Sequence, residues 1–218
     1  MLTKSIIPIF PLPLVVFPDE VMPLHIFEEC YISMINRCIE WQKLGPEQGL
    51  FGIHLVKEGR LESVGCAVRV EKIAQRYEDS RMDILTRGFR RYRVGRIIKS
   101  EVYQQIEAEF FDDFLLPADI PLRHHAVALH CKLLEVAGKP FSVPVFDNQS
   151  LPSFILAHAA GLDVDERQRL LEITNENERL RALIAYYQTA IPEAVKNTEL
   201  KERIHANGYF RHLKSLEI

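Results

Sequence analysis

Histidine is the residue type in this sequence that most directly suggests metal chemistry, and there are eight histidines. Three of them, His124, His125 and His130, fall close together in one predicted helix. Two ligands that share a helix face lie three or four residues apart, and no two of these histidines have that spacing. A His-Glu-x-x-His motif is also absent from the sequence. We therefore expect solvated or core histidines and no metal site.

Two other kinds of catalytic motif are absent from the sequence. A nucleotide-phosphate loop presents backbone N–H groups from glycines and then Lys followed by Ser or Thr, but the sole Gly-Lys pair, Gly138-Lys139, is followed by Pro140. None of the serines lies in a Gly-x-Ser-x-Gly elbow or is followed three residues later by Lys. The sequence therefore predicts no catalytic residues, no enzymatic activity and no cofactor.

A run of basic residues between Arg81 and Lys99 is the strongest candidate for a polyanion contact. The residues at its centre are Arg87, Arg90, Arg91 and Arg93. One interpretation is a track that contacts RNA phosphates. The favoured interpretation is a solvated sheet face, on which these arginines pair with carboxylates of the next segment, Glu101 to Asp113.

The composition is that of an ordinary globular protein: 218 residues, 47% hydrophobic, 26% charged, with a net charge of −3. This charge argues against a dedicated nucleic-acid binder. The four cysteines show no Cys-x-x-Cys spacing, which favours reduced thiols. Prolines interrupt the apolar stretch before Asp19, so it predicts neither a membrane span nor a signal peptide. We expect a cytoplasmic protein.

The first half of the sequence predicts β-structure with one early helix. Four prolines in residues 6–18 exclude a helix there and favour short extended pieces. Apolar residues from Phe27 to Cys38 recur at intervals of three and four, which predicts a helix over about 27–41 with Phe27 and Tyr31 on its core face. After residue 50 the pattern changes to alternation, which is typical of strands.

The second half predicts helices. Apolar residues between Leu122 and Val136 are spaced by four and three, which indicates one long helix. A capping-box pattern at Asp163 begins another. We expect Pro192 to end the last helix of the bundle and leave a tail with one short helix. The predicted domains are residues 1–115 and 116–192, followed by the tail, 193–218.

Several pieces of the sequence, in order, resemble the N-terminal domain of Lon proteases. The early ones are PIFPL at 8–12, VFP at 16–18, and PLHIFE at 23–28 with Tyr31. The later ones are VGC at 64–66, TRGFRRYR at 86–93, and LLE at 170–172 before Arg179 and Leu180. The resemblance covers about residues 5–190.

The resemblance implies an α+β fold, in which a β-rich PUA-like N-terminal subdomain, a partly open barrel, is followed by a C-terminal α-helical bundle. It also implies a role in recognising protein substrates. The nucleotide motor and Ser-Lys proteolytic domain of the full protease have no counterpart in these 218 residues. The expected protein is therefore a stand-alone substrate-binding domain.

Two functional hypotheses follow, and a small-molecule pocket, which no sequence motif need mark, is a third class that the sequence leaves open. The leading one is a non-catalytic module that binds unfolded or exposed peptide segments of other proteins by strand addition, with a separate ATPase or protease as a candidate second partner. Its candidate peptide-contact residues are Pro23 and His25, which precede the predicted helix. The alternative is RNA binding by the PUA-like fold through the run from Arg87 to Arg96. We expect no membrane partner, and nucleic acid is the less favoured partner.

Overall fold

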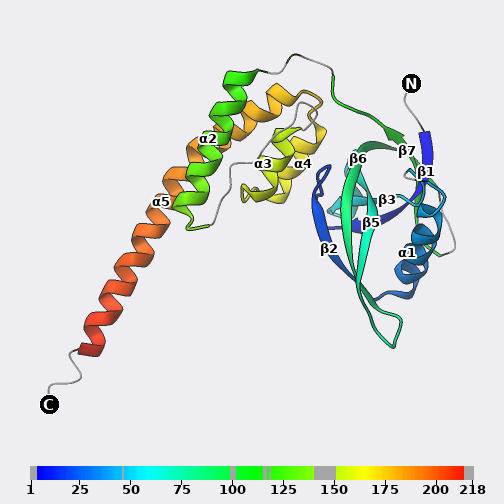
Figure 1. Ribbon diagram of the computed structural model, residues 1–218, viewed down its shortest axis with the longest axis horizontal. Coiled ribbons are helices and arrows are strands. Elements are labelled where there is room, and N and C mark those ends of the chain that lie inside the picture. The colour runs from blue at the N-terminus through cyan, green and yellow to red at the C-terminus, as the bar shows by residue number, and fades with distance from the viewer. Residues whose placement is uncertain are drawn as a thin grey trace. The chain divides into compact units, whose positions relative to one another are not determined.

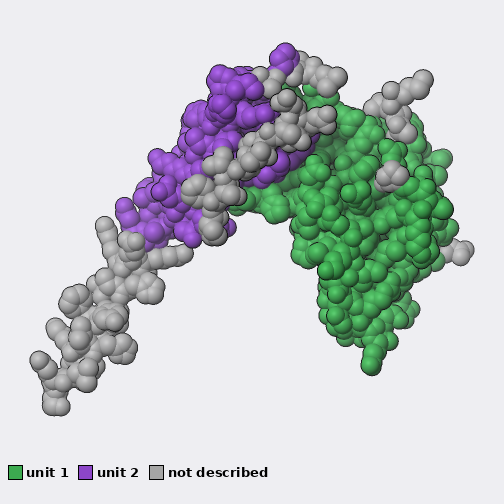
Figure 2. All heavy atoms as spheres, viewed as in Figure 1, with its two compact units in different colours: residues 1–115, 157–175 green, residues 116–156, 176–218 purple. Residues whose placement is uncertain are grey.

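The computed structural model describes residues 4–45, 47–98, 102–114, 117, 119–139 and 151–213. The chain divides into two compact units, coloured separately in Figure 2. Unit 1 comprises Met1–Leu115 and Ala157–Asn175, and unit 2 comprises Leu116–Leu156 and Glu176–Ile218. The chain thus returns to unit 1 after entering unit 2, whereas the predicted domains are continuous in sequence. Those domain boundaries stay a prediction.

Strands precede most of the helices, and the predicted α+β class is confirmed (Figure 1). The strands are β1 (Lys4–Leu12), β2 (Val21–Ile26), β3 (Phe51–Lys57), β4 (Arg60–Leu61), β5 (Val64–Arg76), β6 (Met82–Ile98) and β7 (Gln105–Phe110). The helices are α1 (Glu29–Gln42), α2 (Ile120–Val136), α3 (Pro152–Ala159), α4 (Val164–Glu172) and α5 (Glu176–Leu213). Among them, none has the length and apolar character needed to cross a bilayer.

The strands form one strongly curved sheet in the order β1-β7-β6-β5-β3-β4. The first half of β1 pairs antiparallel with β7, and its second half, from Ile9 to Leu12, pairs parallel with β3. Strands β7 and β3 therefore both pair with β1, but each pairs with only about half of its length. The result is a partly open barrel, as predicted. Strand β2 lies outside this circuit and pairs with β6.

The barrel core surrounds Tyr92, whose side chain is fully buried. Its hydroxyl lies against Gly52 and Gly65, where an added Cβ would come within 2.2 and 2.5 Å of the hydroxyl oxygen. His54, also fully buried, has its Nδ1 3.0 Å from this hydroxyl and its Nε2 2.5 Å from the Glu62 carbonyl. Because a carbonyl can only accept, Nε2 carries the proton and Nδ1 accepts from Tyr92. Burial lowers the pKa of His54 and keeps the ring neutral.

The early helix is shorter at its start than the periodicity predicts. Residue Glu28 has an extended backbone, so α1 begins at Glu29 and Phe27 belongs to the segment that continues from β2. Phe27 is 60% exposed, and the prediction that it packs on the helix core face was wrong. Tyr31 is half-buried against the Phe10 ring, with the ring centroids 4.2 Å apart. Met34 is fully buried, as the stripe predicts.

The four cysteines are free thiols in the structure, of which Cys38 and Cys66 are buried and Cys30 and Cys131 are half-buried. Burial raises the pKa of Cys38 and of Cys66 to about 12, so these two thiols stay protonated and unreactive.

In unit 2 the last helix continues well beyond its predicted end. Helix α5 includes Pro192 and runs to Leu213, so the prediction that Pro192 ends it was wrong. A proline removes one helical hydrogen bond and crowds the preceding turn, but packing can offset that cost. Helix α2 contacts α5 on both sides of the proline: His130 Nδ1 lies 3.0 Å from the Tyr187 hydroxyl, and Thr198 Oγ1 donates to the Val136 carbonyl over 3.3 Å.

Helices α2 and α4 begin at local hydrogen bonds formed by residue types that are typical of helix starts. Asp163 and Glu166 form the predicted capping box at the start of α4, and Asp119 caps α2 by accepting from the Leu122 amide. The α2 helix itself matches its predicted span, from Leu122 to Val136, closely.

Replacing Met34 with Asp should unfold unit 1 at a much lower urea concentration, because the fully buried thioether would be exchanged for an unpaired charge at a cost of several kcal/mol. The single tryptophan, Trp41, lies in α1 and its fluorescence reports the transition. Ser33→Asp, at the exposed neighbouring position, is the matched control and should keep the wild-type midpoint. Equal midpoints for the two variants would contradict the assigned core face of α1.

His54 should make unit 1 less stable below about pH 6.5. Because burial lowers its pKa in the folded state, the unfolded chain binds the proton more readily, and the free energy of unfolding falls as the pH drops from 8 to 5. In His54→Gln this fall should be smaller, although the variant loses about 1 to 3 kcal/mol at pH 8. Urea unfolding followed by Trp41 fluorescence at both pH values measures it. His124→Gln, which changes an exposed histidine, should keep the wild-type pH dependence.

Candidate protein-binding surface

Three arginines of the basic run have half-buried or exposed side chains in unit 1, and each makes a defined contact. They are Arg87, Arg90 and Arg93. Arg90 Nε donates to Asp112 over 2.8 Å, which confirms the predicted pairing with the segment that follows. Arg87 pairs with Glu71 on β5 instead, with 2.8 Å between Nε and Oε1. The guanidinium of Arg93 lies over the Phe111 ring at 4.2 Å.

Arg91 differs from these three because its side chain is only 3% exposed. It forms an ion pair with Asp113, and its Nη1 donates to the carbonyls of Leu171 and Ile173 over 2.9 and 2.7 Å. The prediction of a solvated arginine face was therefore wrong at Arg91. Helix α4 and the residues after it cover this side of β6, which alternation alone does not reveal.

The two other predicted residues, Pro23 and His25, lie on β2, which pairs with β6 along one side only in the described part of the chain. Thr86 Oγ1 donates to the Met22 carbonyl over 2.9 Å, and the Gly88 amide donates to the Glu20 carbonyl over 2.9 Å. The backbone groups of even-numbered residues thus point toward β6. Because strand backbone groups alternate, those of Val21, Pro23 and His25 point to the open side.

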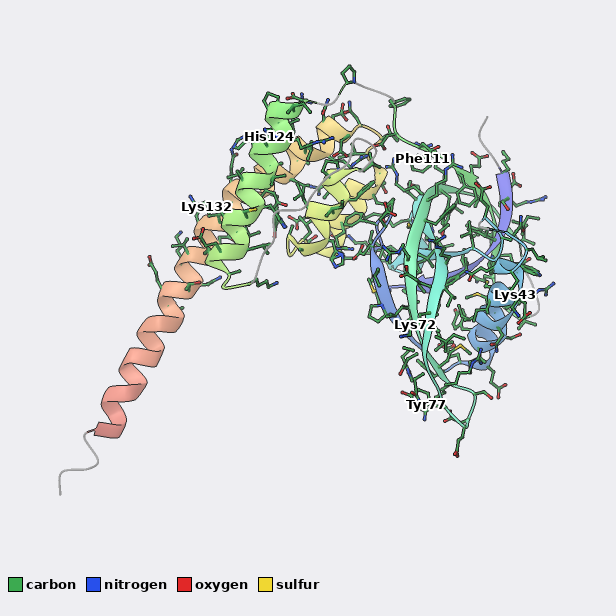
Figure 3. All side chains as sticks on the ribbon, viewed as in Figure 1. Lys43, Lys72, Tyr77, Phe111, His124 and Lys132 are labelled. Atoms are coloured by element: carbon green, nitrogen blue, oxygen red, sulfur yellow. The ribbon has the colours of Figure 1, made fainter. Side chains whose placement is uncertain are left out.

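Side chains beside this open edge form an exposed apolar and aromatic group. Pro23 and His25 are exposed, and Phe27 continues the same alternation beyond the strand end. The rings of His25 and Phe27 stack with centroids 5.9 Å apart, and the Tyr77 ring meets His25 edge-on at 6.0 Å. Figure 3 shows Tyr77 toward the tip of the β5–β6 hairpin.

Asp83 joins β2 to this hairpin through two hydrogen bonds. Its Oδ1 lies 2.6 Å from His25 Nδ1, and its Oδ2 accepts from the Tyr77 hydroxyl over 2.7 Å. These bonds, from Tyr77 first and His25 second, lower the pKa of Asp83, and the bond to Asp83 raises the pKa of Tyr77. We call the group of Val21, Pro23, His25, Phe27, Tyr77 and Asp83 the β2 edge surface.

Sequence reasoning found two members of this surface and missed the rest. Phe27 could have been found, since 23, 25 and 27 alternate as a strand pattern, but the helical periodicity that starts at the same residue hid it. Tyr77 and Asp83 have no sequence signal, because they reach His25 only through the pairing of β2 with β6.

No cluster of side chains suited to a metal ion lies on the β2 edge surface. Within the described residues, no three His, Cys, Asp or Glu side chains gather closely enough to hold a metal ion. Two cavities lie elsewhere in unit 1: one of about 300 Å³ near Gln42 and Arg69, and one of about 160 Å³ near Lys4, Phe89 and Arg90. What the arrangement at β2 can do chemically is to hydrogen-bond and pack against an extended chain.

Comparison with known proteins now places the fold. Residues 6–188 match the family model of the ATP-dependent protease La (LON) substrate-binding domain, and the chain belongs to this family. A Lon N-terminal domain protein from Xanthomonas campestris is similar in structure, with 25% identity, a TM-score of 0.60, and coverage of 84% of this chain and 98% of that one. The N-terminal domain of the Mycobacterium avium complex Lon protease gives 19% identity with the same TM-score and coverage. The predicted family is confirmed.

Arg91→Gln should destabilise unit 1 far more than Arg90→Gln. The first removes a buried guanidinium that pairs with the 12% exposed Asp113 and donates to two carbonyls, at a cost of about 3 to 5 kcal/mol, whereas the Arg90 pair, with Asp112 67% exposed, contributes no more than about 1 kcal/mol. Urea unfolding followed by Trp41 fluorescence compares the two. Equal losses in the free energy of unfolding would show that the buried Arg91 stabilises unit 1 no more than the exposed Arg90 pair does.

Proposed function

We propose that this substrate-binding module captures extended segments of other proteins along the open side of β2, as an added strand. The observation that carries the proposal is that Val21, Pro23 and His25 direct their backbone groups to that side, where no described strand accepts them. An extended peptide laid beside β2 would satisfy these groups, as in other cases of strand addition.

Pro23 sets the strength of this pairing. It has no N–H, so the open side offers carbonyls at Val21, Pro23 and His25 but donors only at Val21 and His25. An incoming residue opposite Pro23 donates to its carbonyl and leaves its own carbonyl to water. Binding is therefore weaker than full strand pairing and reversible, which suits the capture and release of substrates.

The same proline argues against a second copy of the chain as the occupant. Two β2 strands paired antiparallel about Pro23 would place two prolines opposite each other, and each carbonyl would face a nitrogen without hydrogen. A foreign segment with an ordinary residue at that position loses only one of these hydrogen bonds. The favoured partner is thus an unfolded or exposed segment of another protein.

The proposed role is binding alone, in the cytoplasm, without cofactor or membrane partner. These 218 residues hold neither a nucleotide-phosphate loop nor a Gly-x-Ser-x-Gly or Ser-x-x-Lys motif, so we assign cleavage or ATP-driven unfolding of captured segments to an ATPase or protease outside them.

The contacts of the arginine run do not favour RNA. Arg87, Arg90 and Arg91 are held by Glu71, Asp112 and Asp113, and Arg91 is buried. An RNA phosphate would have to compete with a carboxylate at each of these positions.

Replacing His25 with Pro tests strand addition directly. The change removes one of the two N–H donors on the open side and leaves the β6 pairing intact, because His25 points its backbone away from β6. We expect affinity for fluorescein-labelled, reduced and carboxamidomethylated α-lactalbumin, a permanently unfolded probe whose blocked cysteines carry no charge, to fall about tenfold by fluorescence anisotropy, which corresponds to the loss of about one hydrogen bond.

His25→Ala is the matched control, because it removes the same side chain and keeps the N–H. It should bind the unfolded probe more tightly than His25→Pro, with both variants melting at similar temperatures. Equal affinities would show that the β2 backbone does not take part. Submicromolar binding of poly(U) RNA at physiological salt, lost in an Arg87, Arg90 and Arg93 to Gln triple variant that spares the buried Arg91, would favour RNA instead.

A further inference from the structure

We infer that the β2 edge surface selects segments in which apolar residues alternate with lysine or arginine. The inference rests on the proposed strand addition and names the class of substrate that it accepts. It follows from the two faces of β2 and from the charges at its ends.

One face of β2 favours apolar side chains on a bound segment. Met22 and Leu24 are half-buried, and Ile26 is buried on the same face. In a sheet, residues opposite each other on neighbouring strands place their side chains on the same face about 4.5 to 5.5 Å apart. An added strand would therefore place two of its side chains, two positions apart, against Met22 and Leu24, and apolar side chains there would bury the exposed parts of both.

The other face of β2 favours positively charged side chains on a bound segment. Incoming residues opposite Val21, Pro23 and His25 lie on the face of Phe27, Tyr77 and the Asp83 carboxylate. Phe27 is 60% exposed, and an ammonium or guanidinium over an exposed aromatic ring is attracted by its π electrons. A bound segment with alternating residues would therefore place its apolar side chains on the face of Met22 and Leu24 and its basic side chains on the face of Phe27.

The ends of the edge add negative charge. Asp19 precedes β2, and Glu28 and Glu29 follow it, and all three side chains are exposed. Arg87 Nη1 donates to the Asp19 carbonyl over 3.1 Å and offsets part of the charge at that end, so Glu28 and Glu29 supply most of the negative charge. The helix dipole at the start of α1 stabilises the two glutamates without neutralising them. Basic side chains of a bound segment would complement these carboxylates, and acidic ones would be repelled.

Nearby cations do not reverse this charge. Arg87 pairs with Glu71, and Arg81 pairs with Asp79 over 2.6 Å. Lys72, labelled in Figure 3, is opposite Leu85 on the far side of β6 from Pro23. At about 4.8 Å per strand it is about 14 Å from a strand added beyond β2, which exceeds the screening length of about 8 Å at physiological salt.

The test compares three fluorescein-labelled peptides of equal length by anisotropy with the full chain. The first alternates Leu with Lys, the second alternates Leu with Glu, and the third has the composition of the first arranged with a helical period of three and four. We expect the first to bind at least about tenfold more tightly than either of the others, with a preference over the second that shrinks as KCl rises from 50 to 500 mM.

Paired charge variants locate the preference. Glu28→Gln with Glu29→Gln should reduce the ratio of affinities between the Lys and Glu peptides several-fold. Glu193→Gln with Glu199→Gln, which makes the same change in net charge at exposed positions of α5, should leave the ratio unchanged.

Three results would overturn the inference. Equal binding of the Lys and Glu peptides removes the charge preference, and equal binding of the alternating and helical-period Lys peptides removes the strand preference. Equal effects of the two paired variants would assign the preference to net charge rather than to β2. In each case the unfolded α-lactalbumin probe, still sensitive to His25→Pro, would show that the proposed strand addition itself stands.

Discussion

The structure of unit 1 depends on β6 being buried on both of its faces at Arg91 and Tyr92. Tyr92 points into the barrel, where its hydroxyl meets His54 and the two glycines that make room for it. Arg91 points outward and binds Asp113 and the carbonyls at the end of α4. Barrel closure and the attachment of a segment some eighty residues later in the chain therefore meet at two adjacent residues.

A second buried ion pair supports the same attachment. Arg167 of α4 donates to Glu20 over 2.6 Å, and Glu20 also accepts from the Phe17 amide over 2.8 Å. Glu20 comes directly before β2, so the contact that holds α4 also fixes the start of the strand with the open edge. Rigid elements hold a binding surface better than loops do, and this one is placed by a buried salt bridge at one end and by the His25–Asp83 contact at the other.

Much of the fold was predictable because its signals are local. Prolines exclude a helix over residues 6–18, a capping box starts α4, and ordered pieces of sequence identify the family. Two of the errors share one cause. Pro192 was expected to end a helix that α2 stabilises on both sides, and Arg91 was expected to be solvated on a face that α4 covers. In each case a partner distant in sequence outweighed a local preference of a few kcal/mol.

The β2 edge surface likewise depends partly on local sequence and partly on the pairing of distant strands. The sequence by itself determined the strand residues Pro23 and His25, the missing N–H at Pro23, and the carboxylates of Glu28 and Glu29 that follow. Only the tertiary structure decided that Val21, Pro23 and His25 face an open side, because that direction depends on the register with β6. It also brought Tyr77 and Asp83 to His25, since residues more than fifty positions apart meet only when strands pair.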